Sequence, residues 1–315
     1  MLKKNIRYFE KKYLKYLNCN IKYKAKKINC EICNCSKNTK IIDVISWSNQ
    51  YYGYMPIVTC NSCGYVFQLY RFSRKFYENF YSKYYREKIF QNPNPSTKFI
   101  NDQKYRGKKL YNFLKKEKII KNNGSMLDVG CSSGLFLLPF IKNGWECFGN
   151  DPDKAFVDYG LKKYKLPIKY EQAEDMKLKK KSFDLIIIMG SLEHCFDPNI
   201  VMKKCSQAAR NNCVLVLEAR GNPQSQSKKF FNHNHHRYLT ENSLELMMMK
   251  FGFEPILSTS YPITGPTRKG SIFTIGIKKK NKFNLKKLLE YGKKESIASV
   301  IFKYKYFNKM MRENN

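Results

Sequence analysis

Two Cys-x-x-Cys pairs stand early in the sequence, and thiolates at this spacing bind metal. Cys30 and Cys33 form the first pair, and Cys60 and Cys63 form the second after 26 intervening residues. Two such pairs suit tetrahedral zinc, and the stretch between them is long enough for a ribbon of strands. A redox pair would need only one motif, placed at the start of a helix. We therefore expect a structural zinc site, because four cysteines leave no open position for a substrate.

A second pattern suited to chemistry is the glycine turn within residues 126–134, which read Met-Leu-Asp-Val-Gly-Cys-Ser-Ser-Gly. Glycines in a turn after a strand let the backbone approach a ligand closely. The next apolar segment, residues 146–151, ends in Asp151, 23 residues after Asp128. A carboxylate at this place can accept hydrogen bonds from both hydroxyls of an adenosine ribose.

The composition of the turn distinguishes between two cofactors. A dinucleotide site favours Gly-x-Gly-x-x-Gly, because pyrophosphate binds at the N-terminus of the following helix. Here Asp128 precedes Gly130, and Ser132 takes the place of the second glycine. An acid beside the turn would repel pyrophosphate but attract the ammonium group of a methionyl moiety. The turn therefore predicts S-adenosylmethionine rather than NAD.

The elements that would position these residues alternate between strand and helix from residue 125 to about residue 278, which is typical of a mostly parallel α/β sheet. Apolar segments predict strands over residues 126–129, 146–150, 168–170, 183–189, 213–218, 255–260 and 271–277. Helices are expected between most of them, over residues 135–142, 154–163, 200–210 and 241–251. Thr240 is the expected N-cap of the last helix.

Residues 125–260 resemble class I S-adenosylmethionine-dependent methyltransferases, especially those encoded with surface-polysaccharide and sugar-modifying enzymes. The matching segments are residues 127–134, 149–151, 183–186, 192–194 and 197–198. The resemblance implies that the turn holds the methionyl part of the cofactor, through Asp128, Gly130, Cys131, Ser132 and Gly134. It implies that Asp151 binds the ribose, and that the segment Gln172, Ala173 and Glu174 lies near the adenine. The family more often has Asp where Gln172 stands.

These methyltransferases often begin with a cysteine module and an aromatic segment, which residues 63–67, 80–81 and 85–86 match here. The resemblance implies a Rossmann-like, seven-stranded α/β sheet with a small zinc-ribbon-like module in front of it. We predict a zinc-binding module, a helical linker, a methyltransferase domain and a basic helical tail, over residues 1–70, 71–120, 121–278 and 279–315. Sugar C-methyltransferases with the same beginning carry a further substrate domain, which the 37 residues after 278 are not expected to supply.

Methyl transfer to a hydroxyl requires removal of a proton, and a histidine is the natural base at neutral pH. The sequence has four candidates, His194, His233, His235 and His236. His194 follows the strand at 183–189, at the carboxyl edge where α/β proteins bind ligands; a role in shaping the cofactor pocket is the alternative. The resembled family has a similar segment facing the acceptor around His235, which we expect to be the base or an acceptor contact. Metal binding by these histidines has less support, because we find no Asp or Glu ligand nearby.

The net charge of +34 raises the question of a nucleic-acid partner. Lysine outnumbers arginine by 49 to 10, as an AT-rich coding sequence gives, whereas nucleic-acid recognition would favour arginine. The sequence has no Pro-Cys dipeptide, and no Asn/Asp-Pro-Pro-aromatic run follows residue 189. These absences argue against nucleic-acid bases as the substrate. The N-terminus lacks the apolar stretch of a secretory signal, and the longest apolar run is too short to span a bilayer, so we expect a cytoplasmic protein.

The leading interpretation is an O-methyltransferase that acts on a sugar or small metabolite in glycan biosynthesis. An RNA methyltransferase, with the zinc module and basic surface holding RNA, is the alternative. A binding protein with a degenerate pocket is a third, and the intact turn and paired acids argue against it. Apolar residues at helical spacing within residues 283–311 predict either a helix packed on the domain or a basic amphipathic segment on an anionic membrane.

Overall fold

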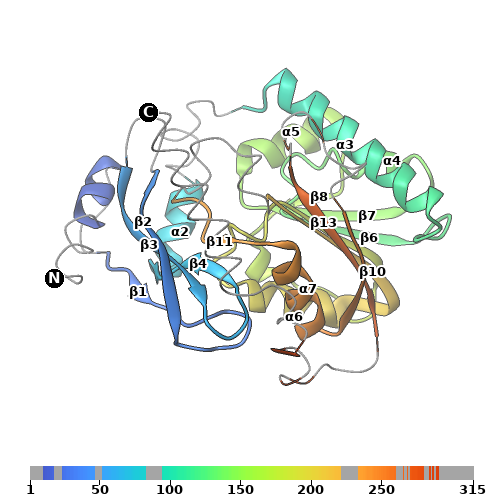
Figure 1. Cartoon of the computed structure of the whole chain (residues 1–315). Helices are drawn as coiled ribbons and strands as arrows, with labels where there is room; N and C mark the ends of the chain where they lie inside the picture. The colour runs from blue at the N-terminus through green and yellow to red at the C-terminus, as the bar shows by residue number, and fades with distance from the viewer. Residues whose placement is uncertain are drawn as a thin grey trace.

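The computed structural model describes residues 10–17, 23–46, 52–82, 94–220, 233–259 and 270–279, and single residues at 265, 268, 284, 286, 289 and 290. These residues form an α/β part with a seven-stranded sheet and an N-terminal module with a four-stranded sheet (Figure 1). The predicted tail, 279–315, lies outside the described residues except at 279, 284, 286, 289 and 290.

The seven-stranded sheet has the strand order β12-β13-β10-β9-β6-β7-β8. Its strands are β6 (Ser125–Val129), β7 (Glu146–Asp151), β8 (Ile168–Tyr170), β9 (Phe183–Met189), β10 (Ala209–Ala219), β12 (Phe253–Thr259) and β13 (Ile272–Lys278). Neighbours from β8 to β10 are parallel, whereas β13 is antiparallel to β10 and β12. The strand order reverses between β6 and β9, and open α/β sheets bind ligands at such a point. The expected seven-stranded, Rossmann-like α/β fold is confirmed.

Helices cover both faces of this sheet (Figure 1). The helices α3 (Thr97–Lys116), α4 (Leu138–Ile141) and α5 (Lys154–Tyr164) cover one face, and α6 (Pro198–Ala208) and α7 (Glu241–Lys250) cover the other. The predicted N-cap is confirmed, since the Thr240 hydroxyl accepts a hydrogen bond from the Ser243 amide. Among the described residues, no helix is both long enough and apolar enough to cross a bilayer.

The central strand β9 shows why the sheet needs helices on both sides. Leu185 and Ile187 pack into the cluster with α3, α4 and α5, while Ile186 and Ile188 pack into the cluster with α6 and α7. All four side chains are fully buried. A strand buried on both faces therefore appears in the sequence as a continuous apolar run.

Two elements differ from their predicted bounds by three or more residues at one end. The helix expected over residues 135–142 is limited to α4, because turns occupy most of the stretch before it. The strand expected from residue 213 already begins at Ala209, directly after α6. Asn212 has a φ of +63°, and the register of β10 against β9 shifts between Ala209 and Val214. Because this part of the strand is polar and irregular, apolar periodicity does not indicate it.

The N-terminal module is a four-stranded antiparallel sheet in the order β11-β4-β3-β2. Its strands are β2 (Asn38–Ser46), β3 (Tyr52–Cys60), β4 (Val66–Gln68) and β11 (Arg237–Tyr238). A separate pair joins β1 (Lys26–Lys27) to β5 (Tyr70–Arg71), and α2 (Arg74–Asn79) follows. Because β11 comes from the second half of the chain, the module sheet contains strands from two of the predicted regions. The boundaries at residues 70, 120 and 278 stay predictions.

Candidate active site and metal centre

Asp128, near the end of β6, has a carboxylate that accepts no hydrogen bond from the described residues. Asp128 is 1% exposed, and neither of its carboxylate oxygens has a hydrogen-bond partner among the described residues. Burial, and secondly the charge of Asp151, raise the pKa of Asp128 well above its usual range, while Arg106 acts in the opposite direction. A buried carboxylate without donors is costly. A ligand with a cationic N–H donor would remove this cost, so the residue fits the ammonium group of a methionyl moiety.

The turn after β6 brings the backbone close to the loop that follows β9. Gly130 has a φ of +72°, and a Cβ atom there would lie 2.4 Å from the Cβ atom of Ser191. The Ser191 hydroxyl donates to the carbonyl of Val129 at 2.7 Å. Only glycine suits a position with this φ and this contact. A side chain at residue 130 would therefore push apart the two loops at the carboxyl edge of the sheet.

The second predicted acid, Asp151, lies at the carboxyl end of β7, beside the turn. Its Oδ2 accepts from the amide of Ser132 at 2.7 Å, and its Oδ1 accepts from the amide of Asp153 at 2.8 Å. The two backbone donors hold the carboxylate toward the same edge as Asp128. Its role toward a ribose stays a prediction.

The segment predicted to lie near the adenine begins beside β7. Gln172 precedes the short helix η2 (Ala173–Asp175), and the Glu171 amide donates to the Asp151 carbonyl at 3.1 Å. The carboxylate of Glu174 accepts from the amide of Asp197 at 3.1 Å. Glu174 therefore joins this segment to the start of α6, and the adenine contact stays a prediction.

Two of the four histidines, His194 and His235, lie together beyond the end of β9. The ring centroids of His194 and His235 are 4.7 Å apart. His194 Nδ1 lies 2.9 Å from the Asn234 carbonyl and 3.3 Å from the Tyr81 hydroxyl. Burial, and secondly the charge of Arg268, lower the pKa of His194 to about 3. His194 is therefore neutral near pH 7, with its Nδ1 proton directed at the carbonyl, and it is a weak base.

The other two histidines pack in the protein interior. His233 stacks on Tyr13 with ring centroids 3.9 Å apart, and burial lowers its pKa to about 3. His236 is fully buried, its ring meets Tyr77 edge-on, and its Nδ1 lies 3.2 Å from the Cys195 carbonyl. These contacts account for both side chains by packing, so the pair His194 and His235 remains the candidate for chemistry.

Glu193 lies beside the pair His194 and His235. The sequence analysis did not identify this residue. One ligand atom each of Glu193, His194 and His235 lies within 4.8 Å of the others, a grouping that could hold a metal ion. The expectation that no acid lies near the histidines is therefore wrong, because β9 ends next to the segment that carries His235. However, Arg268 Nη1 lies 4.0 Å from the Glu193 carboxylate, and its charge opposes a bound cation. The cluster suits proton chemistry better than metal binding.

Arg106, on α3, is the second residue that sequence reasoning missed. Its guanidinium is 1% exposed and donates to the Glu218 carboxylate at 2.5 Å. Its charge also acts on Asp128. One feature of the sequence could have indicated its role: Arg106 lies on the apolar face of a helix, one turn before Leu110. The stretch predicted as a linker thus contributes to the electrostatics of the turn.

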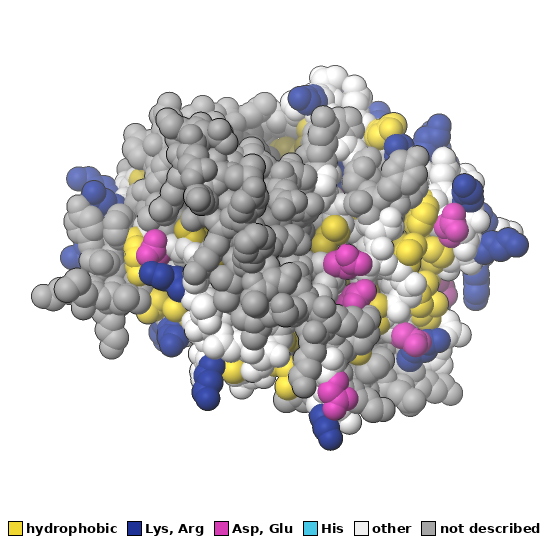
Figure 2. All heavy atoms as spheres, viewed as in Figure 1, with side chains coloured by type: hydrophobic (Ala, Val, Ile, Leu, Met, Phe, Trp, Pro, Cys, Tyr) yellow, Lys and Arg dark blue, Asp and Glu magenta, His cyan; other side chains and the backbone are white. Residues whose placement is uncertain are grey.

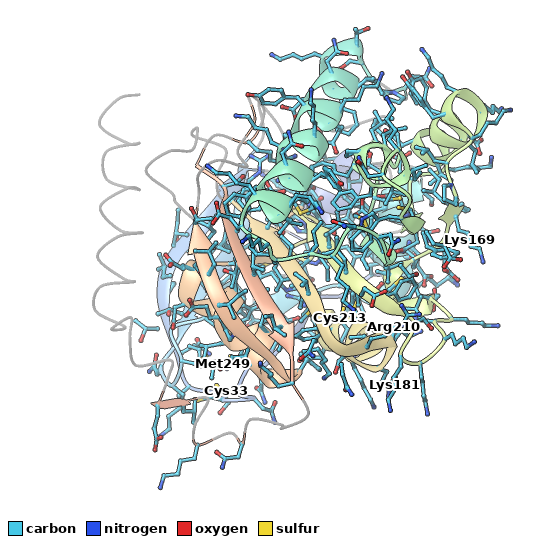
Figure 3. The ribbon with its side chains drawn as sticks, turned by 90° about the vertical axis from the view of Figure 1, so that its right-hand side faces the viewer. Cys33, Lys169, Lys181, Arg210, Cys213 and Met249 are labelled. Carbon is cyan, nitrogen blue, oxygen red and sulfur yellow. The ribbon has the colours of Figure 1, made fainter. Side chains whose placement is uncertain are left out.

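The four cysteines of the module meet at one point. The Sγ–Sγ distances are 3.5 Å for Cys30–Cys63, 3.5 Å for Cys33–Cys60 and 3.7 Å for Cys33–Cys63. A zinc ion with Zn–S bonds of about 2.3 Å at the centre of a tetrahedron requires Sγ atoms about 3.8 Å apart. The thiols therefore fit zinc, and Figure 3 shows Cys33 close to Met249 near the end of α7, with which it shares an apolar cluster.

A family model described as a methyltransferase domain matches residues 99–258, about half of the chain, and the chain belongs to this family. The ubiquinone biosynthesis O-methyltransferase of Pelagibacter ubique (strain HTCC1062) is 33% identical over 99 residues, or 30% of this chain and 41% of that protein. The enzyme of the same name from Rhodopseudomonas palustris (strain HaA2) is 30% identical over 97 residues, or 29% and 38%. The chain thus spans about two fifths of the length of these curated relatives.

Among solved structures, a SAM-dependent methyltransferase from Aquifex aeolicus is similar with a TM-score of 0.43 and 13% identity, covering 55% of this chain and 97% of that one. An S-adenosylmethionine-dependent methyltransferase from Mesorhizobium loti is similar with a TM-score of 0.42 and 13% identity, covering 51% and 95%. The predicted association with polysaccharide enzymes stays a prediction.

Proposed function

We propose that the chain transfers a methyl group from S-adenosylmethionine to a hydroxyl oxygen of a sugar or another small metabolite. The observation that carries the proposal is the buried Asp128 carboxylate without donors among the described residues. Asp151 lies near it, and the turn that follows it contacts the loop that leads to His194. Membership of the methyltransferase-domain family supports it. The names of the curated relatives favour oxygen as the methylated atom, and they add an intermediate of ubiquinone biosynthesis as an acceptor to be tested beside sugars.

When bound, S-adenosylmethionine supplies an electrophilic methyl group on a sulfonium. In this proposal Asp128 holds the ammonium group of the methionyl part, and Asp151 holds the ribose. His235 takes up the proton of the acceptor hydroxyl as the oxygen attacks the methyl group. His194, with a pKa of about 3, is too weakly basic for that task and orients the acceptor instead. Asp128, Asp151 and His235 are all buried side chains.

Calorimetry with S-adenosylhomocysteine tests the proposal. We expect binding to the full chain in the micromolar range, about −8 kcal/mol. Replacing Asp151 by alanine should weaken binding by roughly 1.5–3 kcal/mol, because hydrogen bonds to a charged group are lost. Asp158→Asn is the matched control, since Asp158 pairs with Lys154 on the surface of α5. Preferential binding of NAD, or equal affinity in both variants, would refute the cofactor assignment.

We also propose that Cys30, Cys33, Cys60 and Cys63 hold one zinc ion with a structural role. Their Sγ distances support the proposal, and the fourfold thiolate set leaves no position for a substrate. The RNA alternative lacks comparable support. On the face shown in Figure 2, the lysine and arginine side chains of the described residues are scattered, with acidic and apolar side chains among them.

A further inference from the structure

We infer that the cysteine module is a working part of the acceptor side of the site, because Glu31 and Gln68 of this module position the two histidine-bearing segments. These segments are residues 192–195, which follow β9, and residues 233–236, which precede β11. The inference rests on the proposed function, since it assumes that His194 and His235 face the acceptor. Glu31 and Gln68 act through other residues and are positioning residues.

Glu31 lies within the first cysteine pair and is the centre of a buried polar network. Its Oε2 accepts from Arg237 Nε at 2.9 Å and from the Tyr65 hydroxyl at 2.7 Å. Its Oε1 accepts from Arg237 Nη2 at 2.6 Å and from Arg71. The Glu31 carboxylate thus accepts from two guanidinium groups and one hydroxyl, and these contacts fix the Arg237 guanidinium.

The other edge of the Arg237 guanidinium holds the loop that carries Glu193 and His194. Arg237 Nη1 donates to the carbonyl of Leu192 at 2.8 Å and to the carbonyl of Cys195 at 2.7 Å. These two carbonyls stand on either side of Glu193 and His194 in the sequence. A single planar group thus connects the cysteine pair to both ends of the loop that carries Glu193 and His194, and its rigid geometry couples the positions of the two.

Gln68, the last residue of β4, holds the second segment. Its side-chain Nε2 donates to the carbonyl of His235 at 2.7 Å and to the carbonyl of His233 at 3.2 Å. Its backbone amide donates to the carbonyl of His236 at 2.9 Å. The pairing of β4 with β11 continues this contact, with Arg237 opposite Phe67. The backbone on both sides of His235 is therefore fixed by the module.

The polar character of these contacts distinguishes positioning from simple docking. Apolar residues of the module already pack with α6 and α7 in one cluster, which holds the two parts together. A buried charge network adds little net stability, because desolvation offsets much of its attraction. Hydrogen bonds of this kind do, however, demand one geometry. Their convergence on residues 192–195 and 233–236 fixes the spacing between the His194 and His235 rings.

The experiment uses the full chain labelled with ¹⁵N only at histidine, because four imidazoles give a spectrum that can be assigned by single substitutions. Gln68→Met removes the two side-chain hydrogen bonds at nearly constant volume, and Glu31→Gln removes the anion. Thr59→Val is the matched control, since its buried hydroxyl donates to the Gly64 carbonyl at 3.1 Å, within the module. Metal content and affinity for S-adenosylhomocysteine are measured on each variant.

We expect Gln68→Met to shift or broaden the imidazole signals of His235, and Glu31→Gln to shift those of His194 and His236, while Thr59→Val leaves all four unchanged. Affinity for S-adenosylhomocysteine should change by less than about threefold in all three variants. Unchanged imidazole signals in both interface variants would overturn the inference, and so would equal shifts in the control. If the wild-type chain fails to bind S-adenosylhomocysteine, the proposed function fails, whereas the imidazole spectra still report on positioning.

Discussion

Asp128→Asn should separate ligand binding from stability, because the carboxylate is held in an environment that disfavours its charge. Both oxygens lack donors among the described residues, and burial raises the pKa of Asp128. An ammonium group placed there would gain charged hydrogen bonds worth about 1.5–3 kcal/mol, which corresponds to a roughly 10- to 150-fold loss of affinity for S-adenosylhomocysteine in the variant. Titration calorimetry on the full chain measures this loss directly.

The pH dependence follows from the same raised pKa. In the ligand-free protein, Asp128 is protonated below its folded-state pKa, so stability falls as pH rises from the unfolded value near 3.9 through that pKa. The ammonium group favours the ionised carboxylate, so affinity should increase with pH over this window and then level off. Asp128→Asn removes the ionisation, and the ligand-free variant should unfold at a higher temperature than wild type at pH 7.

Two measurements can contradict this reasoning. Calorimetry in buffers with different ionisation enthalpies should detect proton release on binding to wild type within the window, and no release with Asp128→Asn. The exposed acid Asp158 supplies the control, because Asp158→Asn should alter neither affinity nor proton release. A variant at Asp128 that binds S-adenosylhomocysteine as tightly as wild type would show that this carboxylate does not contact the cofactor.

Three further predictions concern the metal, the base and the alternative partner. Metal analysis should find one zinc per chain, and Cys60→Ser should release it and lower the melting temperature of the protein. Protein that is purified under reducing conditions without chelator and contains no metal would contradict this prediction. With an accepted hydroxyl substrate, His235→Ala should reduce turnover by about 10²–10⁴ with cofactor affinity unchanged, whereas His194→Ala should have a smaller effect on turnover or should also weaken cofactor binding. Near-normal turnover in both variants would leave positioning alone as the source of catalysis. RNA affinity should be weak and should vanish between about 50 and 200 mM salt, and sequence-dependent binding that persists would instead support the RNA alternative.

The part of the fold that is proposed to hold the cofactor could be predicted from local patterns. The strand that leads to Gly130 is buried on both faces, so its apolar run is visible in the sequence, and the glycine that ends it has a positive φ. The same holds for β9, whose predicted and observed bounds agree. In contrast, residues 210–212 of β10 are exposed and polar, and the register there is irregular, so the local pattern indicated only the buried part that follows.

The proposed acceptor side, with His194, His235 and Glu193, could be predicted only in part, since its members come together through tertiary structure. The predicted pair His194 and His235 does meet. The contribution of Glu193 was missed, because no local pattern places it beside a histidine 42 positions later in the sequence. A two-residue strand such as β11 likewise has no periodicity to recognise, and it exists only because β4 offers an edge to pair with.

The sequence separation of the contacts explains why one side could be predicted more fully than the other. Ser132 and Asp151, which meet at the cofactor turn, are 19 positions apart. Gln68 and His235 are 167 positions apart, and Glu31 and Arg237 are 206 apart. One βαβ unit is sufficient to form the cofactor turn, whereas the acceptor side requires the module and the α/β part to be folded against each other. Substitutions within the module can therefore change the choice or alignment of acceptor while the cofactor turn stays intact. If the proposed function is correct, substitutions that change the KM for the acceptor but not the affinity for the cofactor should occur at Glu31 and Gln68 as well as at the sheet edge.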